Sequence, residues 1–358
     1  MIYDNSITKK LGITYPIIQA GMAGGITTPE LVASVSETGA LGTLGAGYLT
    51  PEKTKEAIQK IKQLTHKPFA VNLFIPEHPT FSDKKIKQAN QLLAPIRRDL
   101  NMEEQIQLPE MNKDLFEQQI EVLIEEKVPV CSFTFGLPPK KIVRRLKSEG
   151  ITLIGTATTV NEALANEEQG LDMVVMQGSE AGGHRGTFLG NFQSAMIGTM
   201  ALVPQAKDLV NIPIIAAGGI MDGRGVLAAL ILGAEAVQMG TAFVTTKESG
   251  AHPLYKLAIR ESTEEATTVT KAFSGKPARG IRNTFIQSLE NREHHLPNYP
   301  IQNMLTQEIR KEAAKRNRPE YLALWSGQHP RSSTDKQAGD LIQSILSQIE
   351  DLMGNLGL

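Results

Sequence analysis

The sequence predicts an α/β fold, a (β/α)8 barrel with a helical insertion and a smaller C-terminal subdomain. Eight short runs rich in Val, Ile or Leu each end in Gly or a small polar residue, a pattern typical of parallel strands buried on both faces. Helical stretches separate most of these runs. The 358 residues exceed the roughly 250 of an ordinary barrel by about a hundred. A doubly wound open sheet is the alternative that the pattern leaves open.

The predicted strands cover residues 16–22, 41–47, 69–75, 128–136, 152–158, 172–178, 212–220 and 236–243. The predicted helices between them cover residues 28–38, 51–64, 139–149, 160–169 and 224–232. Thr50 before Pro51, and Thr159 with Glu162, are typical helix starts, because a hydroxyl caps the first turn. Glycines stand where the helices should end, at Gly39, Gly150, Gly170 and Gly233.

Two segments depart from this strand–helix period. Residues 80–127 are a charged helical insertion after the third strand, and the chain after Thr245 is polar and helix-rich, with no further buried strand predicted. Within it, the basic residues of 310–318 alternate with Glu and Ala, which favours a solvated helix. We therefore expect a barrel over residues 1–247, a lid subdomain over 248–317 and C-terminal helices over 318–358 that return to the barrel.

The composition indicates a folded protein that binds small molecules. Hydrophobic residues make up 41% of the chain and charged residues 21%. A net charge of -1 provides no general attraction to nucleic acid or anionic membranes. The single cysteine, Cys131, excludes a disulfide framework and a cysteine-rich metal centre, and we expect an inert buried thiol. The polar start and the lack of a long apolar run predict a cytoplasmic location.

Glycines at the ends of the last two strands predict a phosphate site. In a barrel, the carboxyl ends of the strands form the active-site face, and phosphate commonly binds after the seventh and eighth strands. Gly218 and Gly219 follow the seventh run, and Met239, Gly240 and Thr241 lie in the eighth. Glycine lets free backbone N–H groups approach an anion closely. The alternative is that these glycines only turn the chain.

A polar loop after the sixth strand contains the best catalytic candidate. It runs from Gln177 to Gly186 and includes His184. Imidazole titrates near neutral pH, so His184 can act as a general base or as a hydrogen-bond donor, although a lone histidine is more often structural. We expect Glu180 and Arg185 to brace the loop.

The first and third strands supply groups suited to a flat ring. Ala20, Gly21 and Met22 combine small side chains with exposed amides, and Asn72 is a polar amide among apolar neighbours. Its partner is either the edge of a heteroaromatic ring or a neighbouring strand. The chain lacks a Walker A loop, HExxH, GxSxG and histidines at metal-ligand spacing, so no metal site is expected.

Several motifs resemble one family in the same order. PIIQAGMAGG, GSEAGGHRG, IIAAGGI and VQMGTAF, followed by KAFSGKPAR and WSGQ, are similar to the nitronate monooxygenases, formerly called 2-nitropropane dioxygenases, which are FMN-dependent TIM barrels. The resemblance covers about residues 13 to 330. It implies a catalytic role for His184. The FMN contacts that it implies are Asn72, Gln177, Gly182, Gly218, Gln238, Met239, Gly240 and Thr241.

The resemblance also implies a reaction. An alkyl nitronate, such as propionate 3-nitronate, passes an electron to FMN, O2 traps the radical pair, and oxidative denitration detoxifies the nitronate. An FMN- and NAD(P)H-dependent enoyl-acyl carrier protein reductase is the alternative, since its barrel and EAGGH loop are similar; the insertion and the Trp325–Gln328 stretch favour the monooxygenase. A non-enzymatic flavin-binding sensor is a third reading, against which the His184 loop argues. The sequence leaves a homodimer open and assigns no role to Tyr299.

Overall fold

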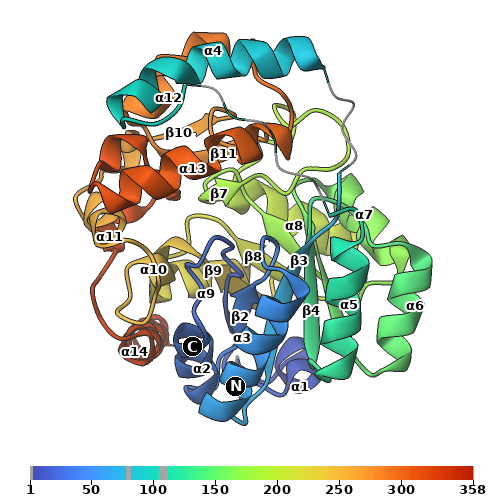
Figure 1. Cartoon of the computed structure of the whole chain (residues 1–358). Coiled ribbons are helices and arrows are strands. Elements are labelled where there is room, and N and C mark those ends of the chain that lie inside the picture. The colour runs from blue at the N-terminus through green and yellow to red at the C-terminus, as the bar shows by residue number, and fades with distance from the viewer. Residues whose placement is uncertain (1–2, 78–81, 105, 107, 109–111, 358) are drawn as a thin grey trace.

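The barrel is closed. The computed structural model describes residues 3–77, 82–104, 106, 108 and 112–357 (Figure 1). Eight parallel strands pair in the order β1-β9-β8-β6-β5-β4-β3-β2. A bridge between Ile18 and Leu41 joins β1 to β2 and completes the ring. This closure confirms the predicted barrel and is incompatible with an open doubly wound sheet.

Every predicted run contains one barrel strand. The strands are β1 (Ile17–Gln19), β2 (Gly42–Gly45), β3 (Phe69–Phe74), β4 (Val130–Thr134), β5 (Thr152–Ala157), β6 (Met173–Gln177), β8 (Ile214–Ala217) and β9 (Ala236–Met239). Their inward side chains form one apolar cluster that includes Ile154 and Val175. The short helix α1 (Ser6–Leu11) adds Ile7 and Leu11 to this cluster and so closes the amino-terminal end of the barrel.

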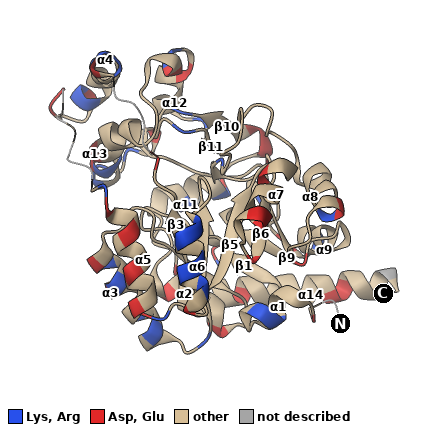
Figure 2. Ribbon diagram, turned by 90° about the vertical axis from the view of Figure 1, so that its right-hand side faces the viewer, with Lys and Arg blue, Asp and Glu red and all other residues tan. Residues whose placement is uncertain are grey.

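The outer helices follow the predicted positions closely. They include α2 (Pro29–Glu37), α3 (Pro51–Leu64), α6 (Lys140–Ser148), α7 (Val160–Gln169) and α9 (Gly223–Ile231). Thr50 and Thr159 cap α3 and α7 through their side chains, as expected. The sequence did not predict α8 (Thr199–Leu209), whose pattern is interrupted by Pro204. Figure 2 shows basic and acidic residues interspersed over the outer helices.

A second layer of structure covers the carboxyl ends of the strands (Figure 1). It contains α4 (Asp83–Asp99), α11 (Pro253–Arg260), α12 (Thr284–Leu289), α13 (Ile301–Lys315) and the 3-10 helices η1 (Glu264–Ala266), η2 (Glu290–His295), η3 (Pro319–Tyr321) and η4 (Pro330–Ser332). The sequence did not predict its strands β10 (Thr267–Thr270) and β11 (Ala278–Ile281). They form an antiparallel sheet with β7 (Gly183–His184), which belongs to the loop after β6. We call this layer the lid.

The inserted segment contributes one helix to the lid and one helix to the barrel. Helix α4 packs on α13, and the buried Arg97 donates to the carbonyl of Leu305 at 2.9 Å. In contrast, α5 (Leu115–Glu125) packs on α3 and β3 in the outer layer of the barrel, so the segment that leaves the barrel ends before residue 127. Its expected start at Thr80 lies outside the described residues. After the lid, α14 (Ala338–Leu356) packs on α9 and α2.

Helix α2 lies so close to β2 that only glycine fits at position 42. A Cβ atom on Gly42 would lie 2.2 Å from the carbonyl oxygen of Val32. We predict that Gly42→Ala lowers the free energy of unfolding by about 1–3 kcal/mol or more, because backbone must move to relieve the overlap. Denaturant unfolding measures this change. Gly354→Ala in α14, where a Cβ meets open space, is the control and should stabilise by roughly 0.5–1 kcal/mol. Equal unfolding midpoints for the two variants would contradict this packing.

Candidate active site

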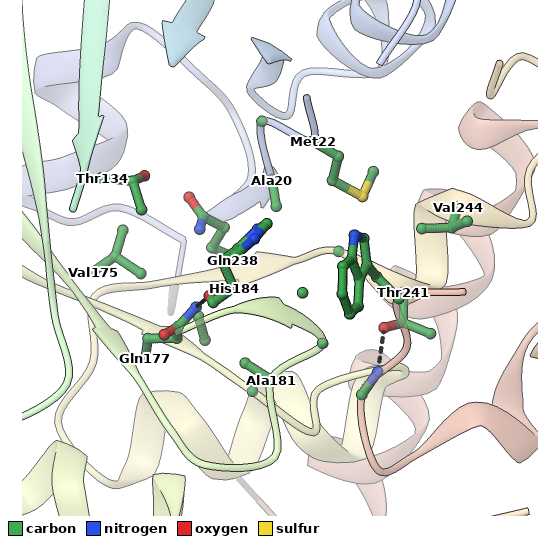
Figure 3. A pocket seen from close by; sticks show the side chains of 18 of the residues that line it. Ala20, Met22, Thr134, Val175, Gln177, Ala181, His184, Gln238, Thr241 and Val244 are labelled. Carbon is green, nitrogen blue, oxygen red and sulfur yellow. Dashed lines mark hydrogen bonds between the residues drawn. The ribbon is translucent and has the colours of Figure 1, made fainter. Parts of the chain in front are cut away.

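A deep cavity opens between the carboxyl ends of the strands and the lid. It contains about 1300 Å³ of space between protein atoms, including its opening to solvent. All eight barrel strands, or the loops that follow them, reach its wall, as expected at the active-site face of such a barrel. Figure 3 shows Ala20 and Met22 on one side of this cavity and Gln177 and Ala181 on the other.

The structure brings together all but one of the predicted site residues. Those lining the cavity are Ala20, Gly21, Met22, Asn72, Gln177, Gly182, His184, Gly218, Gly219, Gln238, Gly240 and Thr241. Met239 is the exception: its side chain packs in the apolar core and is 1% exposed. Successive residues of a strand point to opposite faces, so Gln238 and Gly240 face the cavity while Met239 faces the outer helices. Met239 pairs with Gln19 of the first strand through the backbone, and its carbonyl oxygen accepts from Ala20 N at 2.9 Å.

One end of the cavity presents backbone donors for an anion. Gly218 and Gly219 have φ angles of +117° and +71°, which favour glycine. Among the described residues, the N–H groups of Gly218, Gly219 and Gly240 have no backbone acceptor. The hydroxyl of Thr241 accepts from Gly327 N at 3.0 Å (dashed in Figure 3), so its own proton is free for a ligand oxygen. We call these groups the anion cradle, and they suit a phosphate.

The opposite wall offers polar groups to the edge of a ring. Asn72 Nδ2 donates to Ser132 Oγ at 2.9 Å and to Thr134 Oγ1 at 3.2 Å, so the neighbouring strand does provide a partner. Its Oδ1 atom accepts from no described residue and can accept from a ring N–H. The amide of Gln238 also lines the cavity. A flat heteroaromatic ring with a phosphate tail therefore fits both ends of the cavity.

The loop after β6 is held by its own side chains. Gln177 donates from Nε2 to the carbonyl of His184 at 3.0 Å and accepts from Gly186 N at 2.8 Å, so its amide is already used to fix the loop. The buried Arg185 donates to the carbonyls of Gly178, Gln177 and Ala195. Glu180 accepts from the backbone N–H and the hydroxyl of Thr199. Arg185 and Glu180 are loop braces, as the sequence indicated.

His184 is positioned jointly by the barrel and the lid. It lies on β7, opposite Ala278 of β11, and its Nε2 atom is 2.8 Å from Ser274 Oγ. The rings of Phe135 and Trp325 lie 5.6 and 5.5 Å from its ring, centre to centre. Burial, followed by the positive charges of Lys276 and Arg310, lowers the pKa of His184 to about 3. The imidazole is therefore neutral at physiological pH.

Two positively charged lid residues, Lys276 and Arg310, lie close enough to act on His184 at the cavity wall. Lys276 is paired with Glu77 at 2.6 Å. Arg310 forms no ion pair within the described part of the chain; its Nη2 atom donates to the carbonyl and to the side-chain oxygen of Asn303, at 3.1 and 2.7 Å. Burial raises the pKa of Tyr48, a cavity residue, and the charge of Arg310 partly offsets this effect. Arg310 is half-buried, so the expectation of a solvated helix over 310–318 is wrong at this residue.

Sequence reasoning missed several residues of the wall. Tyr48, Tyr255, Trp325 and His329 all line the cavity, and they come from a loop, the lid and the chain beyond it. Trp325 lies in the WSGQ stretch, which was the one local signal for this region.

The single cysteine lies in the core, as expected. Burial raises the pKa of the Cys131 thiol.

Other kinds of site find no support in the described residues. No group of three His, Cys, Asp or Glu side chains there is arranged to hold a metal ion. None of the described helices combines the length and the apolar character needed to cross a bilayer.

A closed (β/α)8 barrel with an anion cradle, ring-edge amides and a neutral histidine at its carboxyl end has the features of a flavin-dependent oxidoreductase. The sequence profile described as Nitronate monooxygenase matches residues 5–348. A probable nitronate monooxygenase of Staphylococcus haemolyticus is 52% identical, over 99% of each chain. The chain belongs to the nitronate monooxygenase family.

Solved structures agree with this assignment. The nitroalkane oxidase from Streptomyces ansochromogenes superposes with a TM-score of 0.91 at 37% identity, covering 98% of this chain and 100% of that one. FabK from Thermotoga maritima superposes with a TM-score of 0.77 at 33% identity, covering 98% and 97%. The barrel and the lid are thus shared with both proteins over nearly the whole chain.

The lowered pKa of His184 can be tested directly. We predict that the ring stays neutral from about pH 8 down to about pH 5, because protonation would place a cation in a buried site beside Lys276 and Arg310. Nitrogen-15 NMR of histidine-labelled, flavin-free protein reports the ring's protonation state, and the His184→Asn spectrum assigns its signals. A transition near the ordinary value of about 6.5 would show that the site does not exclude the charged form.

Proposed function

We propose that the protein is an FMN-dependent nitronate monooxygenase that carries out oxidative denitration of alkyl nitronates, such as propionate 3-nitronate, with O2. The observation that carries the proposal is the position of the His184 ring at the cavity wall, where its Nε2 atom lies 2.8 Å from Ser274 Oγ and the positive charges of Lys276 and Arg310 act on it. A neutral ring can donate to an anion or accept a proton from carbon, and the positive charge favours an anionic substrate.

FMN is the cofactor that the cavity suits best. The anion cradle would hold its phosphate, and Ala20, Gly21 and Met22 would lie against its ring. Asn72 and Gln238 would bind the polar edge of the ring. When bound, the flavin would supply one-electron redox chemistry toward the nitronate and O2. The protein's own residues bind and orient the substrate, exclude water and hold a proton.

Ser274 allows His184 to act in two ways. Its hydroxyl lies 2.8 Å from His184 Nε2 and 3.1 Å from the carbonyl of Lys276. When Ser274 donates to Lys276, it accepts from Nε2–H, and Nδ1 is free to take a proton from a neutral nitroalkane. When Ser274 donates to Nε2, Nδ1 carries the proton and can bond to an oxygen of a nitronate. One side chain thus supports both tautomers.

The lid residues support a substrate with a second negative group. The ring of Tyr299 lies 6.3 Å from the ring of His184, centre to centre, and the charge of Arg310 acts on both His184 and the cavity residue Tyr48. A carboxylate separated from the nitronate carbon by one methylene group, as in propionate 3-nitronate, would bind there while the nitronate contacts His184. The rings of Phe74, Phe135 and Tyr299 form a continuous aromatic wall, with centres 4.6 and 5.5 Å apart, that keeps water from the reacting end.

The function is tested by anaerobic titration of the flavin-loaded protein, following flavin absorbance. Propionate 3-nitronate should reduce the flavin rapidly, while NADH should leave it oxidised. Rapid bleaching by NADH with no response to the nitronate would replace the proposal with an NAD(P)H-dependent reductase. A protein that binds flavin but responds to neither reagent would indicate a sensor.

His184→Asn should lower kcat/KM for propionate 3-nitronate by about a hundredfold or more, because general acid–base and orienting groups contribute at least that much. Turnover of neutral nitroethane should fall further, since Asn cannot take a proton. Steady-state oxygen consumption measures both. His66→Asn, an exposed histidine in the turn before β3, is the matched control and should behave as wild type. Wild-type turnover by the His184 variant would remove it from the mechanism.

Arg310→Met should raise KM for propionate 3-nitronate by roughly tenfold to a hundredfold, because a charge-assisted contact with the substrate carboxylate is lost. KM for ethyl nitronate, which has no carboxylate, should change less than about threefold. Arg316→Met on the same helix, where the exposed Arg316 pairs with Glu312 at 2.7 Å, is the control. Equal changes for both substrates would show that Arg310 does not recognise the carboxylate.

A further inference from the structure

The segment 324–329, which we call the C-terminal strap, crosses the phosphate end of the cavity. It contains the WSGQ stretch and reaches the cavity from beyond the lid. Its first residues pair with the lid sheet, since Ile281 N donates to the carbonyl of Leu324 at 2.8 Å and Trp325 forms a bridge with Gly280. Nothing described so far gives the strap a part in the chemistry.

The strap is hydrogen-bonded to three separate loops of the barrel. Gly327 N donates to Thr241 Oγ1 at 3.0 Å, after β9. Gln328 N donates to the carbonyl of Glu180 at 3.0 Å, after β6. His329 Nδ1 lies 3.2 Å from the carbonyl oxygen of Gly219, after β8. The strap therefore fixes the loops that provide or flank the anion cradle.

The His329 ring has a partner on each nitrogen. The carbonyl oxygen of Gly219 can only accept, so Nδ1 must carry the proton of that bond. Nε2 lies 2.9 Å from Ser332 Oγ, which can donate to it. Both contacts lock the ring in one orientation at the cavity wall, with its N–H directed at Gly219.

The carbonyl of Gly219 needs such a partner. Gly218 and Gly219 both have φ in the left-handed region, and neither has a side chain to hinder rotation of the peptide that joins Gly219 to Ile220. A rotated peptide would turn its carbonyl oxygen toward the cradle. That oxygen carries partial negative charge and would repel a phosphate dianion, whereas the cradle's N–H groups attract it.

We propose that His329 is a positioning residue for the phosphate monoester of the flavin nucleotide. It acts through Gly219, whose carbonyl oxygen it holds away from the phosphate, so that the cradle presents only donors. This inference rests on the proposed FMN cofactor, and it assigns to the strap a role in recognising the phosphate rather than the ring.

The test compares two flavins that differ only in the phosphate. Flavin-free protein is titrated with FMN and with riboflavin, and quenching of flavin fluorescence gives each Kd. His329→Ala should raise the Kd for FMN by about tenfold or more and change the Kd for riboflavin by less than about twofold. The phosphorus-31 resonance of bound FMN should also shift. A general loss of cavity structure would weaken both flavins alike.

Conservative variants separate the N–H group from the size of the ring. His329→Asn should restore FMN binding to within about threefold of wild type, because the amide N–H of Asn can occupy the position of Nδ1. His329→Gln, whose amide falls nearer the position of Nε2, should not. The comparison of His329→Asn with His329→Gln still tests the proposal if His329→Ala does not fold. His66→Ala, at the exposed histidine, should leave both Kd values unchanged.

The outcomes distinguish this inference from the proposed cofactor. A wild-type protein that binds neither flavin would overturn both. Normal FMN binding by wild type, together with equal weakening of FMN and riboflavin in His329→Ala or with no weakening of either, would overturn the role of His329 alone. Failure of His329→Asn to recover FMN binding would do the same.

Discussion

Closure of the parallel sheet is the constraint on which the rest of this structure depends. Because all eight strands run the same way, the bridge between Ile18 and Leu41 brings every carboxyl end to one rim. Residues far apart in sequence, such as Ala20 and Thr241, then line one cavity. The backbone N–H groups beyond the strand ends have no next residue to pair with, so they remain available to a ligand. The cavity therefore forms because the carboxyl ends of all eight strands meet at one rim.

The lid supplies what the barrel rim lacks. The rim offers amides, glycines and the aromatic rings of Phe74 and Phe135, whereas Trp325 reaches the cavity from the strap. The positive charges that act on His184 come from the lid, from Arg310 of α13 and from Lys276 in the turn before β11. In the proposed function, substrate selection and cofactor binding would therefore depend on different parts of the chain. Such a division lets one fold serve different sites, and this chain shares its fold with both nitroalkane oxidase and FabK.

Features that depend on a short stretch of sequence were predictable, whereas features that depend on the tertiary fold were not. Strands and capped helices depend on short stretches of chain, so all eight strands were predictable. Gly218 was proposed because it directly follows a strand, and His184 because it belongs to the polar loop after one. Met239 was included as part of a motif, although the alternation of the strand turns its side chain into the core. Arg310 looks like any charge on a solvated helix, since only the tertiary fold turns it inward.

The pairing of β7 with β11 has one more consequence. His184 belongs to the barrel by sequence, yet its ring is bonded to Ser274 and its strand to Ala278, both of which are lid residues. A lid movement large enough to separate these strands would also remove the partner of the imidazole. A molecule bulky enough to require that separation would therefore meet an imidazole without its Ser274 partner. In the role proposed for His184, small substrates that enter without separating the strands would be the ones transformed, so this pairing would itself select substrates by size.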